Sequence, residues 1–423
     1  MDKKLSIDTI AVHSTYKPDS TGATNPPLYL SNAYKYEDTQ HAADLFDLKR
    51  EGYIYTRLHN PTTTVLEETV AALEGGVAAV ATSSGHFAEV MLLTSLASQG
   101  DEIIASNCLY GGTINMFSTT FKKFGITVKF ADQDDASSFE ALVTDKTKAI
   151  YIEALANPAS DIPDFDAIAQ IAQKHRLPLI VDSTCATPYL FRAKEHGAAA
   201  VIHSCTKFLG GHGDVMGGIA VDLGTFDWAS SGRFPNFTEP DTSYHGVIYA
   251  KDFGPAALAV KMRAGAMRDM GGTPSPFNSL ALLQGMQTLH LRMERHVENA
   301  KKLALWLQDH PKVSWVNYGG LEGNKNYELA KKYFPKGPGA MLTFGVKGGL
   351  EQGKNFIEKA SLAIHAANLG DVKTIITHPA ITTHRQLYSE QRIKAGVPDD
   401  LIRVSVGIEN IDDIINDFAQ ALS

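Results

Sequence analysis

The sequence predicts an α/β protein in which a large, doubly wound and mainly parallel sheet domain precedes a smaller C-terminal α+β domain. A chain of 423 residues is long enough for two domains and a large core. Short apolar runs alternate with helical segments from residue 61 to residue 264, as is typical of parallel sheets. A long helical pattern then opens residues 265–423, where we expect the smaller domain.

The first elements follow from local composition. Residues 1–60 are rich in proline and tyrosine and poorly periodic, so we expect an arm there. Val77–Ala81 is apolar and predicts a strand, and the glycine-containing turn at residues 82–86 leads into a helical run over Phe87–Ala97. Glu102–Ala105 predicts the next strand.

The same alternation continues along the chain. Ala149–Glu153, Leu177–Val181 and Ala198–Ile202 are short apolar runs and predict strands. Phe165–His175 has helical character and separates the first two of them. A longer helical periodicity extends from residue 278 to residue 307, with apolar side chains at Leu280, Leu283, Met286, Leu289 and Met293.

Composition excludes several classes of protein. Lys and Arg total 39 and Asp and Glu total 47, and the net charge of −8 argues against nucleic acid as a partner. The cysteines Cys108, Cys185 and Cys205 are too few and too scattered for a disulfide framework or a zinc site. The first eight residues have no apolar signal core, and we find no run long enough to span a membrane. We therefore expect a cytoplasmic protein without a bound metal.

Two polar residues follow predicted strands and indicate a cofactor site. Lys207 follows Ala198–Ile202, with the hydroxyls of Ser204 and Thr206 just before it. Partial burial would lower the pKa of Lys207 and free its amine for a Schiff base, and the hydroxyls suit a phosphate. Asp182 ends the preceding strand, so both could face one ligand. Pyridoxal phosphate needs such a pair, although a surface lysine and a turn aspartate are the alternatives.

Two further features suit the same cofactor. The turn at residues 82–86, which contains Ser84, Gly85 and His86, would present backbone N–H groups at a helix start, where phosphate binds well. Tyr110 follows the strand at Glu102–Ala105 and could stack on a planar ring. The alternative for Tyr110 is a half-buried core tyrosine. We interpret these residues together as a candidate pyridoxal-phosphate site.

From about Ile10 to the C-terminus the chain resembles the fold-type I pyridoxal-phosphate enzymes of cysteine and methionine metabolism. The motifs that carry the resemblance are Tyr55-Thr56-Arg57, Asn60-Pro61-Thr62, Leu73-Glu74-Gly75-Gly76, Ser83-Ser84-Gly85, Tyr110-Gly111-Gly112-Thr113, Asn157-Pro158, Asp182, His203-Ser204-Cys205-Thr206-Lys207, Gly211-His212 and Arg403-Val404-Ser405-Val406-Gly407. The order of these motifs makes the resemblance specific.

The resemblance implies a role for each matching residue at the cofactor. Lys207 would be the catalytic Schiff-base lysine, and Asp182 would pair with the pyridine nitrogen. Tyr110 would stack on the ring and help proton transfer. The phosphate would be bound by the turn and loop residues Ser84, Gly85, the backbone of His86, Ser204 and Thr206. Asn157 would approach the ring hydroxyl.

The resemblance also implies a shared site and a substrate contact. Tyr55 and Arg57 would bind the phosphate of a neighbouring subunit, because the arm at residues 1–60 reaches across in this family. We therefore expect a homo-oligomer, a tetramer built from dimers. Arg403 would pair with the substrate carboxylate, which suits its planar guanidinium. Asn368 and Tyr55 are the other predicted substrate contacts.

Members of the family differ in the reaction they run. Gly112 stands where γ-lyases that degrade methionine carry a cysteine, and the Pro- and aromatic-rich insert at residues 233–246 and Asn368 resemble the O-acetylhomoserine sulfhydrylases. We interpret the insert as a wall of the site rather than an ordinary surface loop. Asp214-Val215-Met216 instead resembles lyases and synthases, and Ser183 and Cys185 depart from the usual family pattern.

We therefore expect a transferase of methionine biosynthesis that converts O-acetyl-L-homoserine and sulfide into L-homocysteine and acetate, with sulfide or a thiol as the partner of the amino-acid substrate. The alternatives are a methionine or cystathionine γ-lyase and a cystathionine γ-synthase. A pyridoxal-phosphate carrier without activity would not need Arg403.

Overall fold

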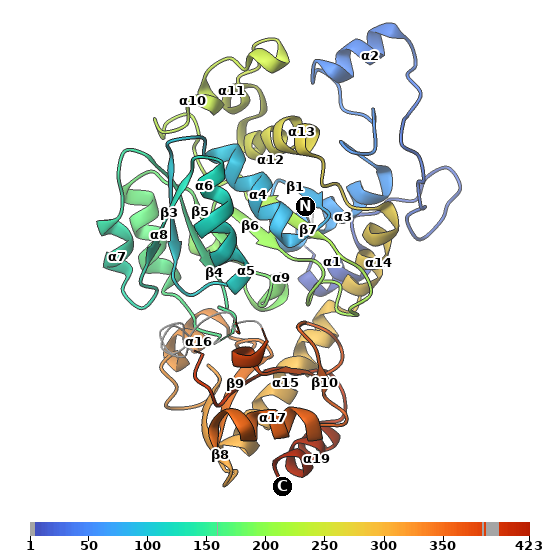
Figure 1. The fold of residues 1–423 in the computed structure, drawn as a ribbon. Coiled ribbons are helices and arrows are strands. Elements are labelled where there is room, and N and C mark those ends of the chain that lie inside the picture. Colours follow the sequence, from blue (N-terminus) through green and yellow to red (C-terminus); the bar gives the residue numbers. More distant parts are fainter. Residues whose placement is uncertain (1–4, 159, 383–384, 386–396) are drawn as a thin grey trace.

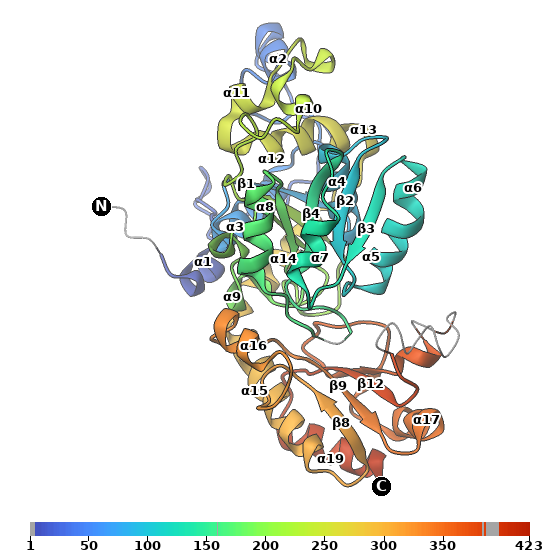
Figure 2. The same cartoon turned by 90° about the vertical axis from the view of Figure 1, so that its left-hand side faces the viewer.

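The computed structural model describes residues 5–158, 160–382, 385 and 397–423 of the chain. Met1–Lys4, which open the segment expected to lack a signal core, lie outside the described residues. Two sheets organise the molecule, and Figures 1 and 2 show the smaller one, with its helices, at the end that holds the C-terminus. The mixed α/β architecture confirms the predicted fold class.

The large sheet has seven strands and is mainly parallel. Only β7 runs antiparallel to its neighbours, β1 and β6. In spatial order the strands are β1 (Ala78–Thr82), β7 (Gly218–Asp222), β6 (Ala200–His203), β5 (Leu179–Asp182), β4 (Thr147–Glu153), β2 (Glu102–Ser106) and β3 (Thr127–Ala131). The strands and helices predicted for this region are present, with ends shifted by one or two residues.

Helices cover both faces of this sheet, so it is doubly wound. One core contains Val70 of α3 and Ile168 of α8, and the other contains Leu92 of α4. Ile103 and Ile104 of β2 point into opposite cores, as alternation along a strand requires. The helices of this region are α3 (Pro61–Glu74), α4 (Gly85–Leu96), α5 (Gly111–Asn115), α6 (Phe121–Lys123), α7 (Ala136–Ala141), α8 (Phe165–Lys174), α9 (Thr187–Leu190), α10 (Pro235–Thr238), α11 (Tyr249–Phe253), α12 (Ala257–Met262) and α13 (Arg268–Met270).

The second sheet has five strands, and only the β10–β11 pair is parallel. Its strands in spatial order are β10 (Ile364–His365), β11 (Ile375–Thr377), β12 (Leu401–Ser405), β9 (Met341–Val346) and β8 (Val313–Asn317). The accompanying helices are α15 (Leu289–Gln308), α16 (Tyr327–Tyr333), α17 (Gly349–Lys359) and α19 (Ile411–Leu422). In Figure 1, α17 and α19 lie in the half of the small domain that is farther from the large sheet.

The helical periodicity at residues 278–307 belongs to two helices rather than one. Two residues separate the end of α14 (Pro276–Met286) from the start of α15. The carbonyl of Gly285 accepts a hydrogen bond of 2.8 Å from the guanidinium of Arg292. The same carbonyl also accepts from the backbone N–H and the hydroxyl of Thr288. These bonds occupy an acceptor that a continuous helix would use. α14 packs against α3 of the large sheet domain, and the boundary predicted at residue 264 stays a prediction.

The aromatic insert at residues 233–246 does not line the site of its own chain. Figure 1 shows α10 and α11 at the end of the large sheet opposite the small domain. The guanidinium of Arg233 there donates to the carbonyl of Thr147, at the start of β4. Phe237 is fully buried and stacks on Trp228 at 4.2 Å between ring centroids. The aromatic side chains of the insert thus extend the core, and the predicted site wall is wrong for this chain.

The N-terminal arm carries α1 (Ile7–His13) and α2 (Thr39–Phe46). In Figure 1, α2 stands apart from both sheets. The arm is tied to the start of α3 through Asn60, whose amide donates to the carbonyl of Tyr29 and to the hydroxyl of Tyr34. Asn60 also caps α3, because its side chain accepts the N–H groups of Thr62 and Thr63. One residue thus fixes both the helix start and the path of the arm.

Candidate active site

Lys207 lies in the turn that follows β6, at the junction between the two sheets. Its side chain is half-buried, and Nζ donates to Oδ1 of Asn368 at 2.5 Å. Asn368 belongs to the loop between β10 and β11 of the small sheet. That loop approaches closely because of Gly370, where an added Cβ would lie 3.0 Å from Cα of Lys207 and 2.6 Å from the backbone nitrogen of Phe208.

Arg403 is the second cation at this junction. It lies in β12, is 6% exposed, and donates to Oδ1 of Asn157 at 3.2 Å and to the carbonyl of Asn368 at 2.8 Å. Burial lowers the pKa of Lys207, and the charge of Arg403 lowers it further. A lowered pKa increases the fraction of Lys207 that is a free amine. Lys207, Asn368, Arg403 and Asn157 are therefore brought together as predicted from sequence.

Asp182 ends β5, and its partner in the β4–β5 register is Glu153. Oδ1 of Asp182 accepts the backbone N–H of Thr184 at 2.8 Å, which is a turn contact, and the residue is largely but not fully buried. Burial raises the pKa of Asp182, and the hydrogen bonds from Thr184 oppose that rise. Thus Asp182 forms the alternative turn contact through Oδ1, while Oδ2, which lies 3.5 Å from the Tyr151 hydroxyl, can still accept from a ligand.

The turn before α4 and the turn before Lys207 touch each other. Ser84 is the N-cap of α4, and its hydroxyl accepts the N–H of Phe87 at 3.2 Å. A Cβ at Gly85 would lie 2.7 Å from Cβ of Ser204, so glycine is required for this approach. Thr206 exchanges hydrogen bonds with the backbone of Gly217 through its hydroxyl. The N–H groups at the start of α4 and the hydroxyl of Ser204 therefore lie in one place, as a phosphate site requires.

Tyr110 is 45% exposed and is part of neither core cluster of the described residues, which argues against the alternative of a core tyrosine. Its ring lies beside that of His86, with centroids 5.7 Å apart and planes tilted by 31°. Its backbone N–H donates to Oε1 of Glu153 at 2.6 Å. A Cβ at Gly112 would lie 2.5 Å from the Tyr110 ring and 2.9 Å from the His86 ring. Gly112 thus leaves room for the placement of both rings.

Tyr55 and Arg57 are not part of this cluster in their own chain. Both are exposed, and the Arg57 guanidinium lies 5.3 Å from the centroid of the Tyr55 ring. Within the described residues, neither side chain makes a hydrogen bond to Lys207, Asp182 or the turn before α4. Their predicted role at a neighbouring subunit stays a prediction.

Sequence reasoning did not single out three buried residues beside Asp182. Glu89 lies in α4, and Tyr151 and Glu153 lie in β4. Glu153 holds the backbone N–H of Tyr110 with one oxygen and that of Asn157 with the other. The available signal was the carboxylate at the end of the predicted strand at residues 149–153, in the same position as Asp182 in the next strand.

Known proteins place the chain in a family. A family model described as Cys/Met metabolism PLP-dependent enzyme matches residues 8–423. The chain belongs to this family. A homocysteine synthase from Schizosaccharomyces pombe is 49% identical over 419 residues, which cover 98% of each chain. An O-acetyl-L-homoserine sulfhydrylase from Leptospira meyeri is 49% identical over 432 residues, covering 100% of this chain and 98% of the relative.

A solved structure has the same fold over the full length. It is described as an O-acetylhomoserine (thiol)-lyase from Campylobacter jejuni and contains N'-pyridoxyl-lysine-5'-monophosphate. The TM-score is 0.95 at 39% sequence identity, with 99% of this chain and 100% of that chain covered. The predicted dependence on pyridoxal phosphate is therefore confirmed.

The residues of the site fit pyridoxal phosphate. Lys207 offers an amine of lowered pKa for the aldehyde, and Asp182 offers a carboxylate for the ring nitrogen. Gly85 allows the helix start and Ser204 to meet where the phosphate would bind. Nε of Arg403 is buried and has no partner among the described residues, so this guanidinium still has a donor to offer.

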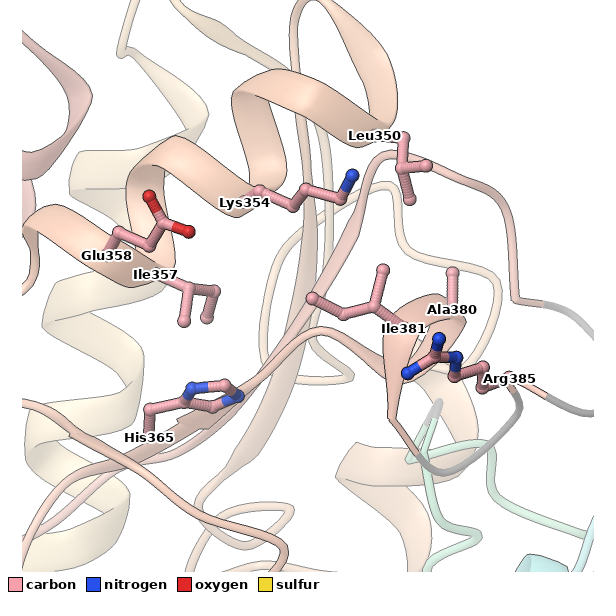
Figure 3. Close-up of a pocket in the computed structure, with 8 residues that line it drawn as sticks. All are labelled: Leu350, Lys354, Ile357, Glu358, His365, Ala380, Ile381 and Arg385. Carbon is pink, nitrogen blue, oxygen red and sulfur yellow. The ribbon is translucent and has the colours of Figure 1, made fainter.

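A separate cavity of about 540 Å³ lies in the small domain and shares no residue with this site. Figure 3 shows its lining beside α17, namely Leu350, Lys354, Ile357, Glu358, His365, Ala380, Ile381 and Arg385. Across the described part of the chain, no group of three or more His, Cys, Asp or Glu side chains is arranged to hold a metal ion. Among the helices formed by the described residues, none is long and apolar enough to cross a membrane.

Proposed function

We propose that this chain is an O-acetylhomoserine sulfhydrylase, which converts O-acetyl-L-homoserine and sulfide into L-homocysteine and acetate. The observation that carries the proposal is the full-length identity, between 44% and 49%, to relatives named O-acetyl-L-homoserine sulfhydrylase or homocysteine synthase. Gly112 and Asn368 support it. The aromatic insert no longer does, because it belongs to the core.

The proposed cofactor contacts follow from the site geometry. Lys207 would hold the aldehyde carbon and Asp182 the ring nitrogen. The phosphate would lie against the start of α4, with N–H groups of Gly85 and His86 and the hydroxyls of Ser84, Ser204 and Thr206. Tyr110 would cover one face of the ring, and Asn157 would reach the ring hydroxyl. When bound, pyridoxal phosphate supplies a ring that takes up the electron pair left by a departing α-proton.

Residues of the chain carry out the remaining steps. Arg403 binds the substrate carboxylate in place of its present contacts with Asn157 and Asn368, and so orients the substrate. Lys207 would hold the cofactor aldehyde before the substrate binds, and its amine, whose pKa is lowered, would take the α-proton of the substrate. Asn368 holds the Lys207 amine near the reacting carbons. Loss of a β-proton then allows acetate to leave Cγ, and hydrogen sulfide adds there while protons return to the carbon skeleton.

The rival reaction is γ-elimination, in which water completes the sequence and releases ammonia and a 2-oxo acid. The motif at residues 214–216 favours it, because it resembles lyases and synthases. A cystathionine γ-synthase would instead use cysteine as the nucleophile. All three reactions use the same cofactor and the same lysine, so only product analysis separates them.

The purified holoenzyme should make homocysteine from O-acetyl-L-homoserine and sulfide with a kcat/KM at least about tenfold above that for 2-oxobutanoate release from methionine or cystathionine. The measurement compares both reactions at equal enzyme and saturating sulfide. Cysteine in place of sulfide tests the synthase reaction. Dominant 2-oxobutanoate release would replace the proposal with the γ-lyase, and faster cystathionine formation would replace it with the synthase.

We further propose a cytoplasmic homotetramer of methionine biosynthesis, built from dimers that share sites. The shared sites are supported by the position of Arg57 and Tyr55, which are exposed and have no contact with the phosphate turn of their own chain among the described residues. In this arrangement the arm at residues 1–60 supplies both side chains to the neighbouring subunit. The proposed domains are the arm, the cofactor-binding domain at residues 61–264 and the small domain at residues 265–423.

Mixed subunits should reveal a shared site. Arg57→Ala and Lys207→Ala are each expected to be inactive as homo-oligomers. After random exchange about half of the dimers are hybrids with one intact site each, so roughly a quarter of the sites should recover. Activity is measured before and after mixing, with subunit exchange verified by mass spectrometry. Absence of recovery after verified exchange would place Arg57 outside the neighbour's site.

A further inference from the structure

A buried hydrogen-bond chain leads from α4 to Asp182. The Tyr151 hydroxyl lies 2.7 Å from Oε1 of Glu89 and 3.5 Å from Oδ2 of Asp182. The hydroxyl of Thr113 bonds to the same Glu89 oxygen at 2.8 Å. Tyr151 is fully buried and Glu89 is 2% exposed, so water does not compete for these groups. Asp182 is the member of the chain that a cofactor would touch.

Which groups donate and which accept in this series of hydrogen bonds depends on which of them are protonated. Burial raises the pKa of Glu89 to about 8 and raises that of Tyr151, so both carry their protons at neutral pH. A protonated Glu89 can donate to the Tyr151 oxygen and still accept from Thr113. The single proton of Tyr151 is then free to point at Asp182. An ionised Glu89 would instead draw that proton away from Asp182.

We propose that Glu89 is a positioning residue that, as a neutral acid, turns the Tyr151 hydroxyl toward Asp182 and so keeps ionised the Asp182 carboxylate that would pair with the ring nitrogen. This proposal rests on the role of Asp182 in the proposed function. A donor to Asp182 makes its carboxylate less basic, so the proton shared with the ring nitrogen stays on nitrogen. The electron sink depends on that proton.

The surroundings of Glu89 are consistent with a neutral form. Asp182 of β5 and Glu153 of β4 are nearby carboxyls that oppose its charge. Tyr151 of β4 and Thr113 of α5 are the two hydroxyls bonded to it. His86 lies on the same helix as Glu89, and its Nε2 is 4.0 Å from Oε2 of Glu89. Burial lowers the pKa of His86. Oε2 has no hydrogen-bond partner among the described residues.

The test follows the ring nitrogen directly. The holoenzyme is prepared with ¹⁵N-labelled pyridoxal phosphate, and the ¹⁵N chemical shift is recorded against pH without substrate. The wild-type signal should be that of a protonated nitrogen at neutral pH. As the pH rises through about 8, Glu89 loses its proton and the signal should move toward the unprotonated value. This readout does not depend on which reaction the enzyme catalyses, so it can fail or succeed separately from the proposed function.

Three variants test the direction of the hydrogen bonds that link Glu89, Tyr151 and Asp182. Glu89→Gln cannot ionise but can donate through its amide, so it should match the wild type at neutral pH and lose the step near pH 8. Thr113→Val removes a donor that favours ionised Glu89, so the step should move to higher pH. Tyr151→Phe should shift the signal toward the unprotonated value at all pH values and weaken cofactor binding about tenfold, as expected for one lost hydrogen bond to a charged group.

Two results would overturn the proposal. A signal of Glu89→Gln that differs from the wild type at neutral pH would mean that Glu89 is ionised there and holds the Tyr151 proton for itself. A Tyr151→Phe holoenzyme with an unchanged signal and unchanged cofactor affinity would mean that the hydroxyl does not reach Asp182. Far-UV circular dichroism checks that each variant is folded, and Glu89→Gln decides the proposal if Tyr151→Phe does not fold.

Discussion

Lys207→Ala is expected to abolish the covalent link between cofactor and polypeptide and to lower turnover by about 10⁴-fold. The amine is removed while the start of α4, Ser204 and Thr206 remain, so pyridoxal phosphate should still bind noncovalently. The link is measured by borohydride reduction followed by peptide mass spectrometry. Noncovalent binding is measured by equilibrium dialysis.

Lys261→Ala is a matched control for this prediction. Burial lowers the pKa of Lys261 as it does that of Lys207. Lys261 lies over the rings of Phe237 and Tyr249, at the end of the sheet that holds the insert. The control variant should keep the reducible link and the turnover. A reducible label on another lysine in the Lys207→Ala enzyme would remove Lys207 from its assigned role.

The architecture of the large sheet was predictable because its strands are buried on both faces. Such strands are continuous apolar runs, and the runs at residues 102–105 and 149–153 have this form. The carboxyl ends of parallel strands share one edge, and so Asp182 and Lys207 could be predicted to face one ligand. The turn that contains Gly85 and precedes α4 could also be predicted, because it is formed by consecutive residues of the sequence.

Other features depend on contacts between distant residues. Arg403 and Asn368 approach Lys207 only because the small sheet packs against the large domain, and family resemblance rather than local pattern supplied them. The insert was misread because aromatic side chains serve a core as well as a site, and Phe234 and Phe237 are buried. The antiparallel strand β7, which was not predicted, pairs through backbone bonds that leave no specific pattern in its side chains.

The network around Asp182 was hidden for a different reason. Glu89 lies in the apolar helix α4, whose sequence indicates a buried helix, but a lone charged residue in such a helix is normally expected on its exposed side. Its partners come from β4 and α5, far away in the sequence. Burial of a carboxyl is a property of the packed structure, so the proton on Glu89 could be inferred only from the assembled contacts.

Asp182→Asn is expected to lower kcat by about 10³-fold, equivalent to about 4 kcal/mol in the transition state. Asparagine keeps the size of the side chain and an acceptor for the N–H of Thr184 at 2.8 Å. It removes the charge that keeps the ring nitrogen protonated, so the electron pair left by the α-proton is no longer delocalised into the ring. Steady-state rates and the exchange of the substrate α-proton with deuterium measure the loss.

Glu153→Gln separates this effect from a general loss of buried charge. Glu153 lies beside Asp182 in the register of β4 and β5 and is also buried, but its oxygens hold the backbone of Tyr110 and Asn157. The variant loses one acceptor, so we expect a cost of about 1 kcal/mol, within tenfold of the wild-type rate. Equal losses of kcat in the two variants would show that removing either buried carboxyl disturbs the structure of the site in the same way. A loss confined to Asp182→Asn assigns the ring nitrogen to Asp182.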